Sequence, residues 1–419
     1  MKFPKPKKSR RFSSPETSQT LAMFLLVFLA LVLAMTYLLQ AEVFPETGDF
    51  PVDFDLFHKV GQMIRDGRFA AAYGAHVAPQ GDVPELPMPF AYPPQHGLLL
   101  WPLGWLPEGV AHMAFVGLPL VVYLIALGRL AGFYFPAVLL AATPVIAINI
   151  LNGQNGLLTG ALGGVFALAF VNGQRRAGVP AALMVLKPHL AVGFALLPLV
   201  GRHWGIVASA LVTLAVVTLG AHLAFGADIW SAFSGAAEAA RARFEGAGAG
   251  FAVNRMTSAY ALAFTLGAGQ TLALAIHVLV ALVALGVAGT LAWRCGLEEL
   301  PLGAALLATL AVSPYVFDYD LPILFAGLAV LAPGIMIRAH WPERLLLLLL
   351  LWLATAQGMV LGLWLGPWLG EAGGGLMGRP EALGAAGYLG TLILVALILR
   401  REPLALSRAQ HEPAPQETD

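Results

Sequence analysis

Long apolar runs recur through this chain from Leu21 to Leu399, and many approach the ~20 residues that a helix needs to span a bilayer. The runs are continuous and do not alternate with polar residues, which favours helices over the strands of a β-barrel. Only 11% of the residues are charged, whereas an ordinary soluble protein has about 25%. The sequence therefore predicts an all-α, polytopic integral membrane protein with about 11–13 transmembrane helices.

The ends of the chain set the expected orientation. Residues 1–20 form a basic tail that we expect in the cytoplasm, because positive residues accumulate on that side of a membrane. The apolar run Leu21–Leu39 is longer than the ~7–15-residue core of a signal peptide, which indicates a retained first span. We expect residues 21–400 to form a single transmembrane domain and the polar residues 401–419 to form a disordered cytoplasmic tail.

Two long loops interrupt this domain, at residues 41–92 and 225–260. In the first, Phe54, Phe57 and Ile64 fall at helical spacing, which predicts an amphipathic helix on the membrane surface. The positions of basic residues place this loop outside, together with Ser313–Asp320. We expect the run that follows residue 92 to enter the membrane without crossing it; the topology of residues 93–130 and the span count stay open.

Composition also limits the partners. The formal net charge is zero, which gives no support to a nucleic-acid partner. The one cysteine, Cys295, has no second cysteine for a disulfide and no neighbouring histidines or cysteines at metal-ligand spacing. A metal site around Cys295 is therefore not expected. We expect no metal and no cofactor elsewhere in the chain.

Polar clusters stand out against the apolar background. An ionisable group at membrane depth costs about 2.5–3.5 kcal/mol on insertion scales, so each is a functional candidate. Lys187 separates two apolar runs, 177–186 and 190–200, that are each short for a span. This pattern predicts a broken helix with Lys187 at its apex, and broken helices at that depth usually line a cavity.

In chain order the clusters form a set of motifs: Asp53-Phe54 with Phe57, Gly67 with Tyr73, Tyr92-Pro93-Pro94, Gly153-Gln154-Asn155, Lys187-Pro188, and Ser313-Pro314 with Asp318-Tyr319-Asp320. The ordered set resembles glycosyltransferase family 87, whose members belong to the C-type membrane glycosyltransferases and use polyprenyl-phosphate sugars, many of them as mannosyltransferases. The chain departs from the family pattern at His189. Its short outer loops after Leu365 also leave no separate acceptor-binding domain.

The resemblance implies transfer of a hexose, mannose being the expected one, from a polyprenyl-phosphate donor to a lipid or glycan acceptor. It implies a bacterial inner (plasma) membrane, with the active site facing the periplasm or the cell exterior. Asp53 matches the family's catalytic aspartate, a general base for an inverting transfer, and Asp55 is its rival. Lys187, His189 and Arg255 are candidates for binding the donor phosphate. The candidates for binding the sugar or the acceptor are Tyr92, Gln154, Asn155, Asp318, Tyr319 and Asp320.

Structural roles compete with these functional ones. Asp53 could cap a helix, because aspartate is a favoured capping residue. Lys187 could extend its side chain toward a membrane interface, and Arg255 could be an ordinary loop arginine. The amide side chains at 154–155 could cap helix ends, and the acids at 318–320 could belong to a solvated turn. Tyr92, Trp101 and Trp105 could form an interfacial aromatic belt.

Two other functions compete with the enzyme. A transporter or flippase of lipid-linked sugars needs a similar groove, but it predicts charges distributed through the spans and pseudo-symmetric halves. Here the acids gather on one expected face and no internal repeat is visible. An inactive scaffold is the third possibility, and the presence of Asp53 argues against it. Besides the donor and acceptor, membrane lipids are the expected partners.

Overall fold

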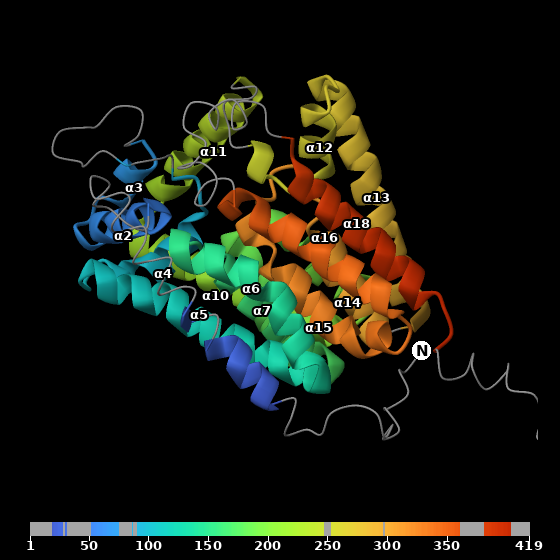
Figure 1. The fold of residues 1–419 in the computed structure, drawn as a ribbon. Helices are drawn as coiled ribbons and strands as arrows, with labels where there is room; N and C mark the ends of the chain where they lie inside the picture. Colours follow the sequence, from blue (N-terminus) through green and yellow to red (C-terminus); the bar gives the residue numbers. More distant parts are fainter. Residues whose placement is uncertain are drawn as a thin grey trace, which may run out of the picture.

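The structure is a computed structural model that describes residues 19–27, 30–31, 52–74, 86, 90–246, 253–295, 298–360 and 381–403. Helices are the only regular elements in this part of the chain, and a single isolated bridge joins Met256 to Phe317. The prediction of an all-α protein is confirmed (Figure 1). Most of the predicted tail at 401–419, from residue 404 on, and most of the predicted first span lie outside the described residues.

Helices make up most of the described chain, and only residues 226–227 separate α10 from α11. Residues 19–27 and 30–31 are helical, and the first part of the chain then contains α2 (Val52–Arg65), α3 (Phe69–Ala72), α4 (Pro94–Leu103), α5 (Glu108–Ala131), η1 (Gly132–Tyr134), α6 (Phe135–Asn152), α7 (Gly156–Val171), η2 (Arg175–Ala177), α8 (Gly178–Leu183), η3 (Met184–Leu186), η4 (Pro188–Leu190), α9 (Val192–Val200) and α10 (Trp204–Phe225). The second part contains α11 (Asp228–Gly246), η6 (Val253–Arg255), α12 (Ala259–Thr265), α13 (Gln270–Cys295), α14 (Glu299–Thr309), η7 (Asp318–Asp320), α15 (Pro322–Met336), α16 (Trp341–Met359) and α18 (Leu383–Leu399).

Three stretches of the described chain are long and apolar enough to cross a membrane: Glu108–Asn152, which comprises α5 to α6, then α10 and α13. Four further apolar helices, α7, α14, α15 and α18, have 10–17 residues. Helix α4 has only 10 residues, about 15 Å, and is too short for a hydrocarbon core of about 30 Å. This length agrees with a segment that enters without crossing, whereas the total of 11–13 spans stays a prediction.

Helices α7 and α15 form the centre of the bundle. Almost every residue of α15 is buried, and it packs on α5, α7 and α14. Small residues on α7 permit this approach, because a Cβ at Gly160 would meet the side chain of Pro322. Tyr123 on α5 adds a hydrogen bond of 2.9 Å from its hydroxyl to the Pro322 carbonyl. The start of α15, and the turn before it, are thereby fixed.

The helix predicted in the first loop is α2, but it is buried in protein. Phe54, Phe57 and Val60 are 0–1% exposed, and the helix packs on α4 and α5. The backbones of Gly61 and Gly104 touch so closely that a Cβ on either would collide with the other segment. Burial differs from the predicted position on the membrane surface because α2 also carries apolar residues, such as Leu56 and Met63, on its other faces.

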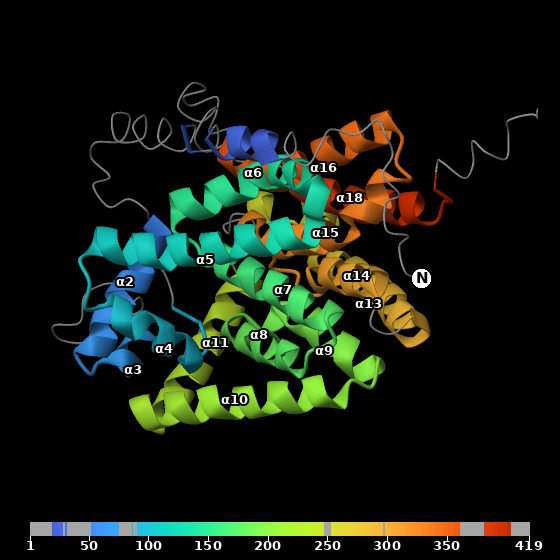
Figure 2. The same ribbon diagram turned by 90° about the horizontal axis from the view of Figure 1, so that it is seen from below.

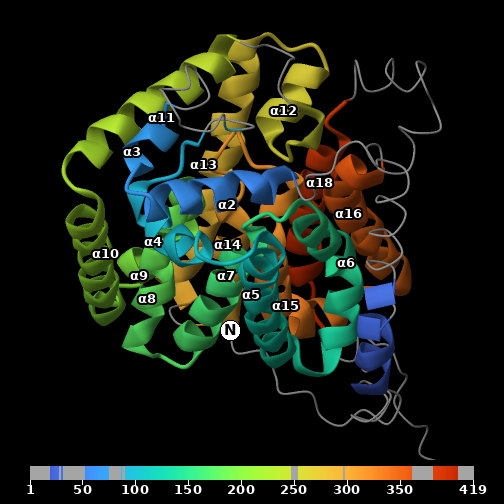
Figure 3. The same ribbon diagram turned by 90° about the vertical axis from the view of Figure 1, so that its left-hand side faces the viewer.

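Residues 225–260 also differ from the predicted loop, since they contain α11 and part of α12. The alanine-rich sequence of α11 favours a helix. Figure 1 places α11 and α12 toward the top of the molecule, and Figure 3 shows α2 and α3 beneath α11. Figure 2 shows α10 at one edge, with α8 and α9 between it and α7.

Candidate active site

The turn between α14 and α15 pairs two buried acids with two different cations. Arg255 donates to both oxygens of Asp318, with Nε–Oδ2 at 3.2 Å and Nη2–Oδ1 at 3.1 Å. The Lys187 ammonium donates to Asp320 Oδ1 at 2.5 Å. Asp318 and Asp320 are 1% and 2% exposed. A solvated turn was one of the predicted alternatives for these acids, and their burial shows that it is wrong.

Tyr319 lies between the two ion pairs. Its ring centroid is 5.0 Å from the Lys187 nitrogen and 5.7 Å from the Arg255 guanidinium carbon, within the range of cation–π attraction. The backbone carbonyl of Tyr319 accepts a hydrogen bond of 3.0 Å from Asn149, and a Cβ at Gly156 would collide with that carbonyl. Tyr319 is therefore fixed through its backbone carbonyl and through the two cations near its ring.

Lys187 reaches Asp320 because the helix around it is broken, as the sequence predicts. Helix α8 and η3 end before Lys187, whose backbone is extended at φ −137° and ψ 79°, and η4 begins at Pro188. The Lys187 side chain is only 5% exposed. The alternative of a lysine that reaches out to an interface is therefore excluded. His189 is exposed, and its ring lies within electrostatic reach of Asp320 and Lys187.

Arg255 reaches Asp318 because the segment before α12 runs alongside the turn. Met256 bridges Phe317, and the amide of Thr257 donates to the Val316 carbonyl at 2.8 Å. Ser258 caps α12, accepting from the Ala261 amide at 3.1 Å. The Arg255 side chain remains 27% exposed, so it is less enclosed than Lys187.

Asp53 and Asp55 have different surroundings. Asp55 forms an ion pair with Lys59, one turn along α2, at 2.6 Å. Asp53 is half-buried in the first turn of α2 and faces Gln154, Arg255 and Lys187. Burial raises the pKa of Asp53, and hydrogen bonding from Gln154 with the charges of Arg255 and Lys187 offsets part of that rise. Asp53 is therefore the carboxylate directed at the cluster.

The connection between α6 and α7 adds two amides. Gly153 ends α6 at φ +62°, a left-handed conformation that suits glycine. The backbone N–H of Gln154 donates to the backbone carbonyl of Asn149 at 3.0 Å. Asn155 stands at the start of α7, yet its side chain caps nothing. Neither polar atom of that side chain has a hydrogen bond of standard geometry with any described residue. Capping is therefore not the role of Asn155.

Aromatic residues line the same region. The Tyr92 phenol lies near Asn155, Lys187 and Asp320, and its backbone carbonyl accepts a hydrogen bond of 2.9 Å from Tyr73. Trp101 and Trp105 are 40% and 68% exposed, so they form no closed wall for a sugar.

Sequence reasoning missed two residues here. Asn149 holds the Tyr319 carbonyl, and His96 is a fully buried histidine whose ring centroid lies 4.6 Å from that of Tyr92. The one available signal for His96 is its four-residue spacing from Tyr92. Among the described residues, no three His, Cys, Asp or Glu side chains are grouped as a metal site would need.

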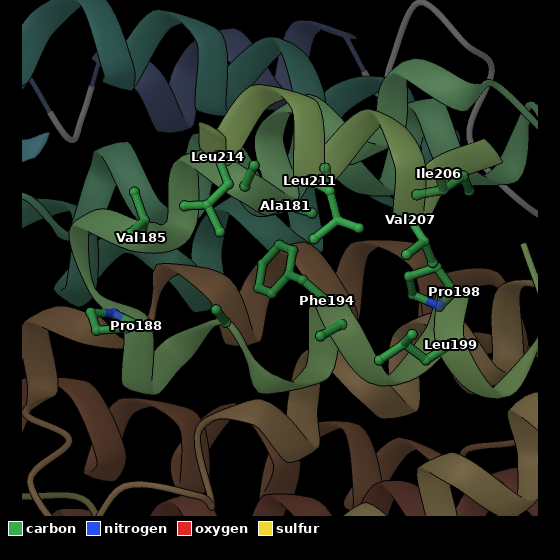
Figure 4. Close-up of a pocket in the computed structure, with 14 residues that line it drawn as sticks. Ala181, Val185, Pro188, Phe194, Pro198, Leu199, Ile206, Val207, Leu211 and Leu214 are labelled. Carbon is green, nitrogen blue, oxygen red and sulfur yellow. The ribbon is translucent and has the colours of Figure 1, made fainter. Parts of the chain in front are cut away.

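An apolar groove of about 330 Å³ begins next to the Lys187 segment. It lies between α8, α9 and α10, and Figure 4 shows Pro188 at one end with Leu199 and Ile206 toward the other. The residues that line it are all apolar: Ala181, Ala182, Val185, Pro188, Ala191, Phe194, Ala195, Pro198, Leu199, Ile206, Val207, Ala210, Leu211 and Leu214. Pro188 in this lining directly follows Lys187, which forms the buried ion pair.

The fold and the site define an all-α membrane protein with a charged, partly enclosed site beside an apolar groove. A model of glycosyltransferase family 87 matches residues 90–314, which is more than half of the chain, and the chain belongs to this family. It is therefore a membrane glycosyltransferase, an enzyme with a sugar donor and an acceptor. The matched region includes Lys187 and Arg255, whereas Asp53 precedes it and Asp318–Asp320 follow it. No match was found among curated proteins or solved structures.

Proposed function

We propose that this glycosyltransferase moves a hexose, mannose in the first instance, from a polyprenyl-phosphate donor to a lipid or glycan acceptor. The active site faces the periplasm or cell exterior of a bacterial inner membrane. The observation that carries the proposal is the state of Asp53. It faces the two cations of the cluster, yet it forms no ion pair with any described residue, whereas Asp318 and Asp320 are each paired.

Asp53 acts as the general base. It accepts the proton of the acceptor hydroxyl while that oxygen attacks the anomeric carbon and the bond from that carbon to the phosphate oxygen breaks. The phosphate keeps the bonding electron pair, and in-line attack inverts the anomeric centre. A carboxylate whose pKa is raised by burial is a stronger base than an exposed one, which suits this role.

Arg255 and Lys187 stabilise the charge that develops on the leaving phosphate. Arg255 uses Nε and Nη2 on Asp318, which leaves the Nη1 donors outside that ion pair, and its side chain is 27% exposed. Lys187 has three N–H donors, of which Asp320 takes one. His189, exposed at the adjoining position, is a third candidate for the phosphate.

The apolar groove accommodates the isoprenoid chain of the donor. Its lining carries no charged or polar side chain, which suits a hydrocarbon, and Pro188 places its end next to Lys187. A lipid phosphate therefore has its head group at the cations and its tail in the groove. Tyr92, Gln154, Asn155 and Tyr319 lie within electrostatic or hydrogen-bonding reach of Asp53 or the cations, and in this proposal they bind the transferred sugar.

The test is transfer of radiolabelled mannose from polyprenyl-phosphate-mannose in membranes that contain the protein. Asp53→Asn should lower turnover by about 10²–10⁴-fold, the usual contribution of a general base. The matched variant Asp55→Asn should keep most of the activity, because an i,i+4 ion pair with Lys59 is worth only about 0.3–0.5 kcal/mol.

Normal turnover by a correctly inserted Asp53→Asn protein would contradict the mechanism, and a large loss at Asp55 instead would assign the base to that residue. Movement of the intact donor across the membrane, with its sugar–phosphate bond uncleaved, would favour a transporter.

A further inference from the structure

His96 is a buried polar side chain in an aromatic setting. It lies in the first turn of α4 and is 0% exposed. Its ring stacks on Phe57 at 5.6 Å between centroids and also contacts Tyr92 and Phe90. Neither ring nitrogen has a hydrogen-bond partner among the described residues. A phenylalanine would fill this space without leaving polar atoms unpaired, so packing alone does not explain a histidine.

The imidazole is neutral under physiological conditions. Burial is the main cause and the positive charge of Lys187 the second; together they lower the pKa of His96 to about 3. From the neighbouring elements, α2 presents Phe57, the segment before α4 presents Phe90 and Tyr92, and Lys187 is the charged group that acts on the ring. A neutral imidazole has one N–H donor and one acceptor nitrogen, and both require partners here.

This pair of requirements identifies the ligand chemistry. A phosphate oxygen only accepts hydrogen bonds, so it would satisfy one ring nitrogen and leave the other unpaired. An alcohol hydroxyl both donates and accepts, so adjacent hydroxyls of a saccharide satisfy both. The side-chain oxygen of Gln154 is also buried without a hydrogen-bond partner among the described residues, so it too can accept from a hydroxyl.

We propose that His96 binds a hydroxyl group of the donor sugar and contributes to the choice of sugar. The donor, and not the acceptor, is favoured because the ring lies within electrostatic reach of Lys187, where the proposed function places the donor phosphate. This inference rests on the proposed function. His96 is a specificity-determining residue of that site and takes no part in moving the proton.

The test compares donors within one enzyme preparation, so that it does not depend on the amount of folded protein. Membranes receive polyprenyl-phosphate-mannose or one of its singly deoxygenated analogues, and kcat/KM is measured for each. Wild-type protein should disfavour the analogue that lacks the contacted hydroxyl by about ten-fold or more, since that analogue leaves the ring unpaired. His96→Phe should abolish this discrimination while it retains the discrimination at the other hydroxyls.

His96→Asn, which keeps a donor and an acceptor, should restore part of the effect. The matched control is His112→Phe, because His112 also packs on an α2 aromatic, with 5.1 Å between its centroid and that of Phe54. This control should keep the full discrimination. Unchanged discrimination in His96→Phe would overturn the inference and leave the proposed function intact. A wild-type protein that transfers sugar from no polyprenyl-phosphate donor would overturn both.

Discussion

The buried ion pair between Lys187 and Asp320 permits a test that separates stability from chemistry. Both side chains are at most 5% exposed, and their charged atoms are 2.5 Å apart. Lys187→Met leaves the Asp320 carboxylate buried without its partner, which costs about 3–5 kcal/mol of folding free energy. Adding Asp320→Asn removes that charge. In the wild type the Phe317 backbone N–H donates to Asp320 Oδ2 at 3.1 Å, and the asparagine keeps an oxygen that can accept this hydrogen bond. The double variant should therefore recover most of the stability.

The free energy of unfolding is measured in lipid nanodiscs for the wild type, both single variants and the double variant. These four values give the interaction energy between Lys187 and Asp320. Transfer from polyprenyl-phosphate-mannose is then measured on the same four proteins. If Lys187 stabilises the leaving phosphate, the double variant is stable yet has lost about 10²-fold or more of its turnover, because one charge-stabilising donor is worth that much.

Two results would refute the reasoning. A Lys187→Met protein as stable as the wild type would show that the buried carboxylate does not depend on its partner. A double variant that recovers normal turnover as well as stability would assign Lys187 to structure and leave the phosphate to Arg255 and His189.

Three further predictions concern other parts of the site. The value of kcat/KM should fall at acidic pH as Asp53 becomes protonated. Arg255→Gln should move this acidic limb to higher pH, because the charge of Arg255 lowers the pKa of Asp53. A shift of the limb to lower pH would contradict this. Gly156→Ala should lower the free energy of unfolding by about 1–3 kcal/mol or more, because its Cβ would collide with the Tyr319 carbonyl, whereas Gly286→Ala, in open space on α13, should not. Transfer should persist in EDTA; a loss that a divalent ion restores contradicts the metal-free mechanism.

The sequence predicted the class of fold, whereas the contacts among the candidate residues became visible only in the structure. Apolar runs alone indicated a helical membrane protein, and two short runs around Lys187 indicated a broken helix. The ion pair of Asp55 was available in principle, because Lys59 lies at the i,i+4 position on the same helix. The burial of α2 was hidden, because its apolar residues suit lipid and protein equally well.

The pairing of the charges was beyond sequence reasoning. Asp318 and Asp320 stand two residues apart, yet their partners are 63 and 133 residues away along the chain. Which cation reaches which acid depends on how the segment before α12 and the break after η3 are placed against the turn. His96 was hidden for a related reason, since its unpaired nitrogens become visible only when its neighbours are known.

The contact between Gly61 and Gly104 has a consequence for how turnover can be altered. The cations are fixed to the bundle centre through the turn that leads into α15, whereas the proposed base is carried on α2, whose position depends on its packing against α4. A larger residue at Gly104 displaces α2 and carries Asp53 away from the leaving group, while the cations and the groove stay in place. The spacing between base and leaving group is thus set outside the site, so a substitution there changes the catalytic rate while the cations that hold the donor phosphate stay in place.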